Sequence, residues 1–165
     1  SEEVITRPQD LDDQSTPSSV STMLDLMLDL QPLFPDAGFE ELAERSLARY
    51  GSKIEKSPLE HSSLSMVKYR RVTGSLEVTI LADEIPDGWP AELAKVYHTD
   101  KVLYPRPLSQ ERMENWLEKL GSDSLPPVWD REPINGEPTL YVCGNQTCSE
   151  PTDRIEEAID WIENL

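Results

Sequence analysis

Residues 141–151, YVCGNQTCSEP, contain both cysteines of the chain and predict how its C-terminal part folds. The apolar and β-branched residues 139–142 that lead into this stretch favour a short buried strand. After it, the spacing of Asp153 and Glu156 is that of a capping box, which predicts the start of a helix. A strand that passes through a polar loop into a helix is typical of an α/β unit. We therefore expect a strand-to-helix turn that presents two thiols.

Strand-like and helix-like segments alternate upstream of this turn. Residues 77–82 and 101–104 have the apolar, β-branched content of strands, and a helical period follows each. A proline-rich loop then precedes the last strand, and we expect it to hold Trp129 against the body of the unit. Strands separated by helices favour a parallel sheet with right-handed crossovers. The overall expectation is a mixed α/β chain, in which residues 75–165 form a small three-stranded, mostly parallel βαβαβα unit.

Residues 17–74 show helical periods instead. Thr16 followed by Pro17 is typical of an N-cap with proline at the first helical position, and the next residues are apolar around most of a helix. Two further helical periods follow, so we predict a helical hairpin with one additional helix. Residues 1–16 are polar and are expected to form a flexible segment. Since the chain does not begin with Met, either its N-terminus has been processed or it is a piece of a longer protein, and we expect the second.

The chain is strongly acidic. Its 15 Lys and Arg against 32 Asp and Glu give a formal net charge of −17. Such a charge repels phosphate backbones and anionic membrane surfaces, so we expect neither nucleic acid nor membranes as partners. The sequence contains no apolar run long enough to span a bilayer, and its first ten residues, SEEVITRPQD, lack the features of a signal peptide. We therefore expect a cytoplasmic protein.

Polar side chains follow the first and third predicted strands. Asp83 and Glu84 come directly after the first strand, and Cys143 and Cys148 follow the third. In α/β sheets, ligands bind beyond the carboxyl ends of the strands. If these two strands are neighbours, carboxylates and thiols would line one rim of the sheet. The alternative is a loop that capping interactions and small buried side chains hold in place, without a ligand.

The cysteine spacing limits the chemistry. Cys-x4-Cys is not the Cys-x-x-Cys motif of dithiol exchange, and two thiols cannot complete the four-ligand shell of structural zinc. His61 and His98 lie in other elements with no ligand spacing. We predict no metal site and no cofactor. The candidate thiol pair Cys143 and Cys148 would be free buried thiols or a conditional disulfide, with redox activity as an alternative.

A family resemblance covers nearly the whole chain. The motif Y-V-C-x4-C-x-x-P-T is similar to the C-terminal end of the YyaL-type, thioredoxin-domain-containing proteins, the spermatogenesis-associated protein 20-like family. This chain matches it at Tyr141, Val142, Cys143, Cys148, Pro151 and Thr152. Upstream, the family pattern D-G-x-x-P-S-G-N-S resembles the segment that contains Asp13, Pro17, Ser18 and Ser21. Ser19 and Val20 stand where that pattern has Gly and Asn.

The resemblance implies a larger parent protein. Its N-terminal thioredoxin-like domain would lie outside this chain and would be followed by an α/α toroid similar to six-hairpin glycosidases. Residues 17–74 would then be the end of that toroid, and residues 75–165 a closing α/β domain. Asp13, Ser18 and Ser21 would line the toroid mouth at a helix N-terminus, where a carbohydrate ligand of the parent would bind.

Two functions follow from the resemblance. In the first, the chain is a noncatalytic C-terminal module that closes or supports the helical barrel. Its partner would be the remainder of the parent polypeptide or another protein, and the isolated chain would catalyse nothing. In the second, the chain is part of a carbohydrate-active enzyme, glycosidase- or epimerase-like, or of a thiol-redox enzyme. The catalytic residues of that enzyme would lie mostly outside this chain.

Overall fold

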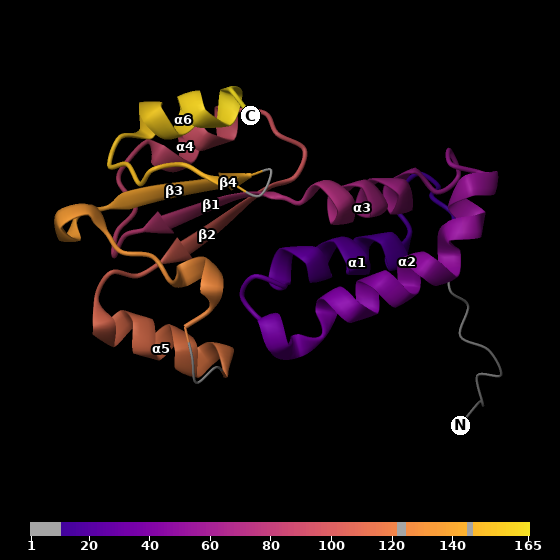
Figure 1. The fold of residues 1–165 in the computed structure, drawn as a ribbon, viewed down its shortest axis with the longest axis horizontal. Coiled ribbons are helices and arrows are strands. Elements are labelled where there is room, and N and C mark those ends of the chain that lie inside the picture. The colour runs from indigo at the N-terminus through magenta and orange to yellow at the C-terminus, as the bar shows by residue number, and fades with distance from the viewer. Residues whose placement is uncertain (1–10, 122–124, 145–146) are drawn as a thin grey trace. The chain divides into compact units, whose positions relative to one another are not determined.

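The computed structural model describes residues 11–121, 125–144 and 147–165, and the chain divides into two compact units, Ser1–Val72 and Thr73–Leu165 (Figure 1). We call these the N-terminal unit and the C-terminal unit. The boundary falls between Val72 and Thr73, whereas the change in sequence pattern predicted it after residue 74. Residues 1–10 of the expected flexible segment lie outside the described residues.

The N-terminal unit consists of helices. These are α1 (Ser19–Leu30), the short 3-10 helix η1 (Pro35–Ala37), α2 (Phe39–Lys56) and α3 (Ser62–Thr73). Their buried side chains form one apolar cluster, made of Leu11, Leu24, Ala43, Leu47, Tyr50, Ile54, Leu64 and Val67. The four cluster residues from α2 recur at helical spacing, as its amphipathic sequence predicted. Leu11 is only 5% exposed, so the described end of the expected flexible segment packs on the helices.

The start of α1 differs from the expected cap. The N-cap is Ser18, not Thr16, and its side-chain oxygen accepts a 3.2 Å hydrogen bond from the N–H of Ser21. Asp13 accepts a 2.9 Å hydrogen bond from the N–H of Ser18 and so holds the cap residue in extended geometry. Pro17 therefore precedes the cap. From the sequence alone, Thr16 and Pro17 were the better candidates for the helix start. The hydrogen bond from Ser18 to Asp13 forms only when the loop is folded, so the sequence could not reveal it.

The C-terminal unit is a mixed sheet with helices. Along the chain it contains β1 (Leu76–Leu81), α4 (Trp89–Lys95), β2 (Lys101–Arg106), α5 (Gln110–Leu120), η2 (Pro127–Trp129), η3 (Ile134–Gly136), β3 (Thr139–Gly144), β4 (Thr147–Cys148) and α6 (Ile155–Glu163). The strand order is β2-β1-β3-β4. β1 and β2 are parallel, whereas β3 is antiparallel to both β1 and β4.

This sheet differs from the expected three-stranded, mostly parallel unit in two ways. β3 runs antiparallel to β1, because the long loop after α5 returns the chain to the opposite end of the sheet. The alternating pattern of a strand is the same in both directions, so it does not predict the direction. β4 adds a fourth strand of two exposed residues, which is too short and too polar to carry a strand signal.

Helices cover both faces of this sheet. The even-numbered positions of β1 and β3 face α4 and α6, which lie side by side above the sheet in Figure 1, and together these elements form the main core of the unit. On the other face, Thr79 donates a 3.1 Å hydrogen bond to the carbonyl of Val128. Trp129 is 1% exposed, and its ring lies 5.7 Å from that of Trp116 on α5. The proline-rich loop thus holds Trp129 against the unit, as expected.

The N-cap residue of α6 is Arg154, not the predicted Asp153, and it makes no side-chain capping bond. Thr152, rather than Asp153, accepts a hydrogen bond from the N–H of Arg154, at 3.1 Å, and it donates to Glu157 at 2.6 Å. Thr152 is held in place by an antiparallel bridge to Leu140 of β3. The predicted capping box of Asp153 and Glu156 is therefore wrong, because pairing with β3 delays the start of the helix.

Candidate functional site

Cys143 and Cys148 form a disulfide between β3 and β4. The two residues are paired directly opposite each other in the antiparallel register, with their Cα atoms 4.0 Å apart. Directly opposed residues place their side chains on the same face of a sheet. Cys148 is exposed and Cys143 is half-buried. Of the states that the sequence left open, the structure contains the disulfide.

A cation that sequence reasoning missed lies beside this bond. Nη2 of Arg131 is 3.8 Å from the sulfur of Cys143 and 3.9 Å from the sulfur of Cys148. The guanidinium carbon is 5.5 Å from the centre of the Tyr141 ring, a cation–π distance. Nε of Arg131 is buried and has no hydrogen-bond partner among the described residues. Arg131 is in the proline-rich loop, where no periodic pattern links it to the cysteines.

The backbone around Arg131 is well anchored. Its N–H donates to the carbonyl of Trp129 at 2.8 Å, and its own carbonyl accepts from Nη1 of Arg106 at 3.0 Å. The hydroxyl of Tyr141 donates to the carbonyl of the next loop residue, Glu132, at 2.8 Å. These contacts fix the loop against β2 and β3 and so hold Arg131 beside the disulfide.

Asp83 and Glu84 lie at the opposite end of the sheet from the disulfide. In the antiparallel register Glu77 is paired with Cys143 and Leu81 with Thr139. The carboxyl end of β1 therefore meets the amino end of β3. The hypothesis of a single rim with carboxylates and thiols is wrong, because it required the two neighbouring strands to be parallel.

The carboxylate of Asp83 already has partners within the fold. It accepts hydrogen bonds of 3.0 Å from the N–H groups of Leu108 and Ser109, and one of 3.1 Å from the hydroxyl of Ser109. The N–H of Ser109 is the main cause that lowers the pKa of Asp83 below its usual value. Glu84 is exposed. This geometry assigns Asp83 to holding the start of α5.

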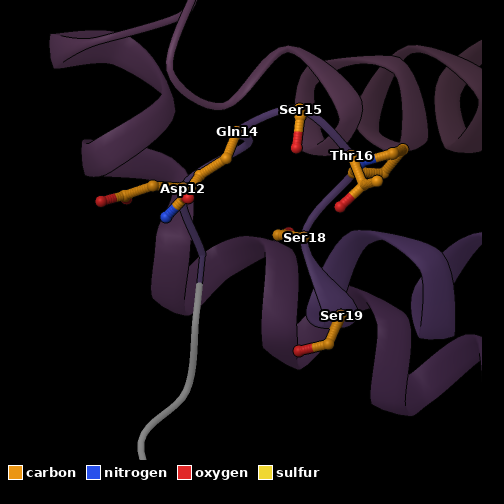
Figure 2. Close-up of a pocket in the computed structure, with 7 residues that line it drawn as sticks. Asp12, Gln14, Ser15, Thr16, Ser18 and Ser19 are labelled. Carbon is orange, nitrogen blue, oxygen red and sulfur yellow. The ribbon is translucent and has the colours of Figure 1, made fainter.

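A hollow of about 310 Å³ lies beside the start of α1 (Figure 2). It is lined by Asp12, Gln14, Ser15, Thr16, Pro17, Ser18 and Ser19. Of the three residues that the family resemblance suggested for a ligand site, only Ser18 lines it. The hydroxyls of Ser18 and Ser21 lie 2.5 Å apart and are both buried, so they bond each other.

Asp13 connects the segment before α1 to α3. Besides the N–H of Ser18, its carboxylate accepts hydrogen bonds from the hydroxyl of Ser62 at 3.0 Å and from the N–H of Ser63 at 2.6 Å. Burial raises the pKa of Asp13, but the N–H groups of Ser63 and Ser18 outweigh it, and the net pKa is lowered. The carboxylate is therefore ionised at neutral pH and cannot act there as a proton donor.

The histidines are each held by local contacts. His61 is buried, with Nδ1 3.0 Å from the carbonyl of Ser57 and Nε2 3.2 Å from Oδ1 of Asp12. Nδ1 of His98 accepts a 3.3 Å hydrogen bond from the N–H of Asp100. Within residues 11–121, 125–144 and 147–165, no group of three His, Cys, Asp or Glu side chains is placed to hold a metal ion.

Comparison of the chain with protein-family models, with curated proteins and with solved structures finds no match. Membership in the thioredoxin-domain-containing family therefore stays a prediction. In the part of the chain that the structure describes, every helix is too short or too polar to cross a membrane.

Proposed function

We propose that this chain is a noncatalytic module whose N-terminal unit packs against further helices of a larger, thioredoxin-domain-containing protein. The observation that carries the proposal is the second apolar face of α1. Leu24, on the inner face, is 3% exposed, whereas Met23 and Leu26 are 53% and 49% exposed. The last two residues are three positions apart and so share one side of the helix. Large apolar side chains grouped on a surface mark a site of association.

The neighbouring helix α3 repeats this pattern. Leu64 and Val67 are buried in the apolar cluster of the N-terminal unit. Met66 and Tyr69, again three positions apart, are 47% and 56% exposed. A helix with apolar side chains on both sides is typical of the interior of a larger helical assembly. We infer that the partner is the remainder of the parent polypeptide, whose next helices cover these faces.

The use of the candidate carboxylates supports a noncatalytic role. Asp13 and Asp83 each accept two backbone N–H groups and one serine hydroxyl. Carboxylates that satisfy helix starts in this way stabilise the fold, and their lowered pKa values keep them ionised near neutral pH, so neither is a proton donor there. Carbohydrate turnover by the parent, if it occurs, would then depend on residues outside this chain.

The start of α4 bears on the thiol-redox alternative. Low-pKa cysteines of redox proteins often lie at a helix N-terminus. Here α4 follows β1 and begins with Gly88, Trp89 and Pro90, without a cysteine. This favours a closing domain over a dithiol oxidoreductase of the usual kind.

A cytoplasmic location is part of this proposal. The acidic composition supports it, because a net charge of −17 favours a dissolved protein that does not adhere to nucleic acid or anionic lipid. In that compartment most disulfides are transient, so the Cys143–Cys148 bond would form and break with conditions.

Self-association tests the exposed apolar faces. The chain on its own should form oligomers in light scattering, because the described residues leave Met23 and Leu26 about half exposed. The double variant Met23→Lys, Leu26→Glu should be a monodisperse monomer. Tyr97→Lys is the matched control, since Tyr97 is 86% exposed but lies in the other unit. A monomeric wild-type chain at high concentration would contradict the proposed surface.

Catalysis tests the noncatalytic assignment separately. The chain should release no sugar from a panel of aryl glycosides and should not interconvert free hexose epimers, as measured by chromatography of the products. Turnover that persists after repurification would overturn the assignment. In that case Asp13→Asn and Asp83→Asn would show which unit carries the activity.

A further inference from the structure

We propose that Cys143 and Cys148 form a thiol–disulfide exchange site, in which Arg131 holds the thiolate released when an incoming dithiol reduces the bond. The proposal depends only on the C-terminal unit. It is independent of the partner proposed for the N-terminal unit, and it assigns a chemical step to a residue that no pattern in the sequence marks.

Access decides which sulfur is attacked. Cys148 is exposed and belongs to β4, the edge strand of the sheet, whereas Cys143 is half-buried on the next strand. Exchange begins when a thiolate attacks one sulfur in line with the S–S bond. The sulfur of Cys148 is the one that an external thiolate reaches. Cys143 is therefore the leaving group.

Arg131 is placed to stabilise that leaving group. Its Nη2 lies 3.8 Å from the sulfur of Cys143, and a guanidinium stays charged at any pH at which the protein is folded. A nearby cation lowers the pKa of a thiol, and a thiol of lower pKa leaves faster. Stacking on Tyr141 and the hydrogen bond from Arg106 to its carbonyl hold Arg131 in place.

Other charged groups near the bond act in both directions. Glu77 of β1 is paired directly opposite Cys143, so a residue with a negative charge lies on the neighbouring strand. Arg106 of β2 adds a second positive charge near the loop that carries Arg131. Tyr141 contributes a neutral ring. Arg131, with its nitrogen beside both sulfurs, is the group that favours the thiolate most directly.

The electrons and protons of the exchange balance with a dithiol as the reductant. Its first thiolate forms a bond to the sulfur of Cys148, the Cys143–Cys148 bond breaks, and the electron pair stays on Cys143. The second thiolate of the reductant then attacks the reductant sulfur in this mixed disulfide. The reductant becomes a disulfide, Cys148 is released, and both cysteines take up the two protons that the dithiol lost.

The rate of reduction tests the role of Arg131. Folded protein is mixed with dithiothreitol at pH 7, quenched with an alkylating reagent, and its thiols are counted by intact mass. We expect Arg131→Met to slow reduction about threefold, because a leaving thiol whose pKa is one unit higher departs more slowly by about half a log unit. Arg131→Lys should restore most of the rate. Arg154→Met, which removes an exposed arginine of the same unit, is the control and should leave the rate unchanged.

A second measurement distinguishes an effect of Arg131 on the Cys143 thiol from an effect of Arg131 on the stability of the protein. In Cys148→Ser the remaining thiol of Cys143 is titrated by its thiolate absorbance in the ultraviolet. Adding Arg131→Met should raise this thiol pKa, so that the thiolate fraction at pH 7 falls about tenfold. Tryptophan fluorescence confirms that each variant is folded, since all four tryptophans lie in the C-terminal unit. Equal pKa values in the two proteins, or a disulfide that dithiothreitol reduces only after unfolding, would overturn the proposal.

Discussion

The carboxylate of Asp13 accepts a 2.6 Å hydrogen bond from the backbone N–H of Ser63, a residue 50 positions further along the chain. The same carboxylate accepts from the N–H of Ser18, the N-cap of α1. One side chain thus holds the starts of two helices. Because helix starts leave N–H groups without partners inside the helix, a carboxylate placed there replaces bonds that water would otherwise supply.

Removal of this carboxylate should destabilise the N-terminal unit. We expect Asp13→Ala to lower its free energy of unfolding by about 0.5–2 kcal/mol, the usual cost of removing a side-chain acceptor at a helix start. Far-ultraviolet circular dichroism measures the loss of helix. All four tryptophans lie in the C-terminal unit, so tryptophan fluorescence serves as an internal control and should report an unchanged transition.

The contribution of Asp13 should also disappear in acid. Its pKa in the folded protein lies below the ordinary value of 3.8, so the folded state favours the ionised form. The resulting stability is present above 3.8 and is lost as the pH falls through the folded pKa. The wild-type helical transition should therefore weaken in acid more steeply than that of Asp13→Ala. Parallel pH profiles for the two proteins would contradict this assignment.

Asp83 should have the corresponding effect on the other unit. Asp83→Asn removes a charged acceptor from the N–H groups of Leu108 and Ser109, which precede α5. Thermal unfolding followed by tryptophan fluorescence should then occur at lower temperature, since α5 carries Trp116 against Trp129. The pKa of Asp83 is also lowered, so its contribution is likewise lost on acidification. The variant Asp87→Asn, at an exposed position of the same unit, is the matched control.

Replacing Arg70 should cost less stability than replacing the two carboxylates that pair with it. It is 5% exposed and pairs with Asp25 at 2.7 Å and with Asp29, both on α1, which keep much of their contact with water. Arg70→Met leaves two hydrated carboxylates and should be nearly neutral for stability. The double variant Asp25→Asn, Asp29→Asn leaves a buried guanidinium without these anions and should cost about 3–5 kcal/mol. Urea unfolding followed by circular dichroism compares the two, and equal losses would count against this account.

A larger residue at Gly144 should press against the side chain of Leu165. A Cβ at Gly144 would lie 3.0 Å from Cδ1 of Leu165 and 3.3 Å from Cδ1 of Leu76. We expect Gly144→Ala to destabilise the C-terminal unit by at most about 1 kcal/mol, the low end of the cost of overpacking, because Leu165 is 41% exposed and its side chain can shift. In the double variant with Leu165→Ala, the loss should be smaller than the sum of the single losses. Strict additivity, measured by urea unfolding and tryptophan fluorescence, would show that Leu165 is not the obstacle.

The helices and most strands were predictable because their signals are local. In α2 the spacing of apolar residues indicates which face is buried, and in β1 the β-branched run does so. Both signals lie within a few neighbouring residues. The helix caps were less predictable. Asp13 and Asp83 bond to helix starts from segments that are distant in sequence. The position of Thr152 before α6 is fixed by its bridge to Leu140. Local spacing cannot reveal a partner that only the folded chain supplies.

The sequence by itself determined that this chain combines a helical part with an α/β part, that its formal net charge is −17, and that its thiol chemistry is confined to Cys143 and Cys148. Only the tertiary structure decided the direction of β3, because the period of a strand is the same in both directions. That direction separates the cysteines from Asp83. The same direction places both cysteines beside Arg131. The loop that carries Arg131 is distant in sequence and reaches the cysteines only in the folded sheet.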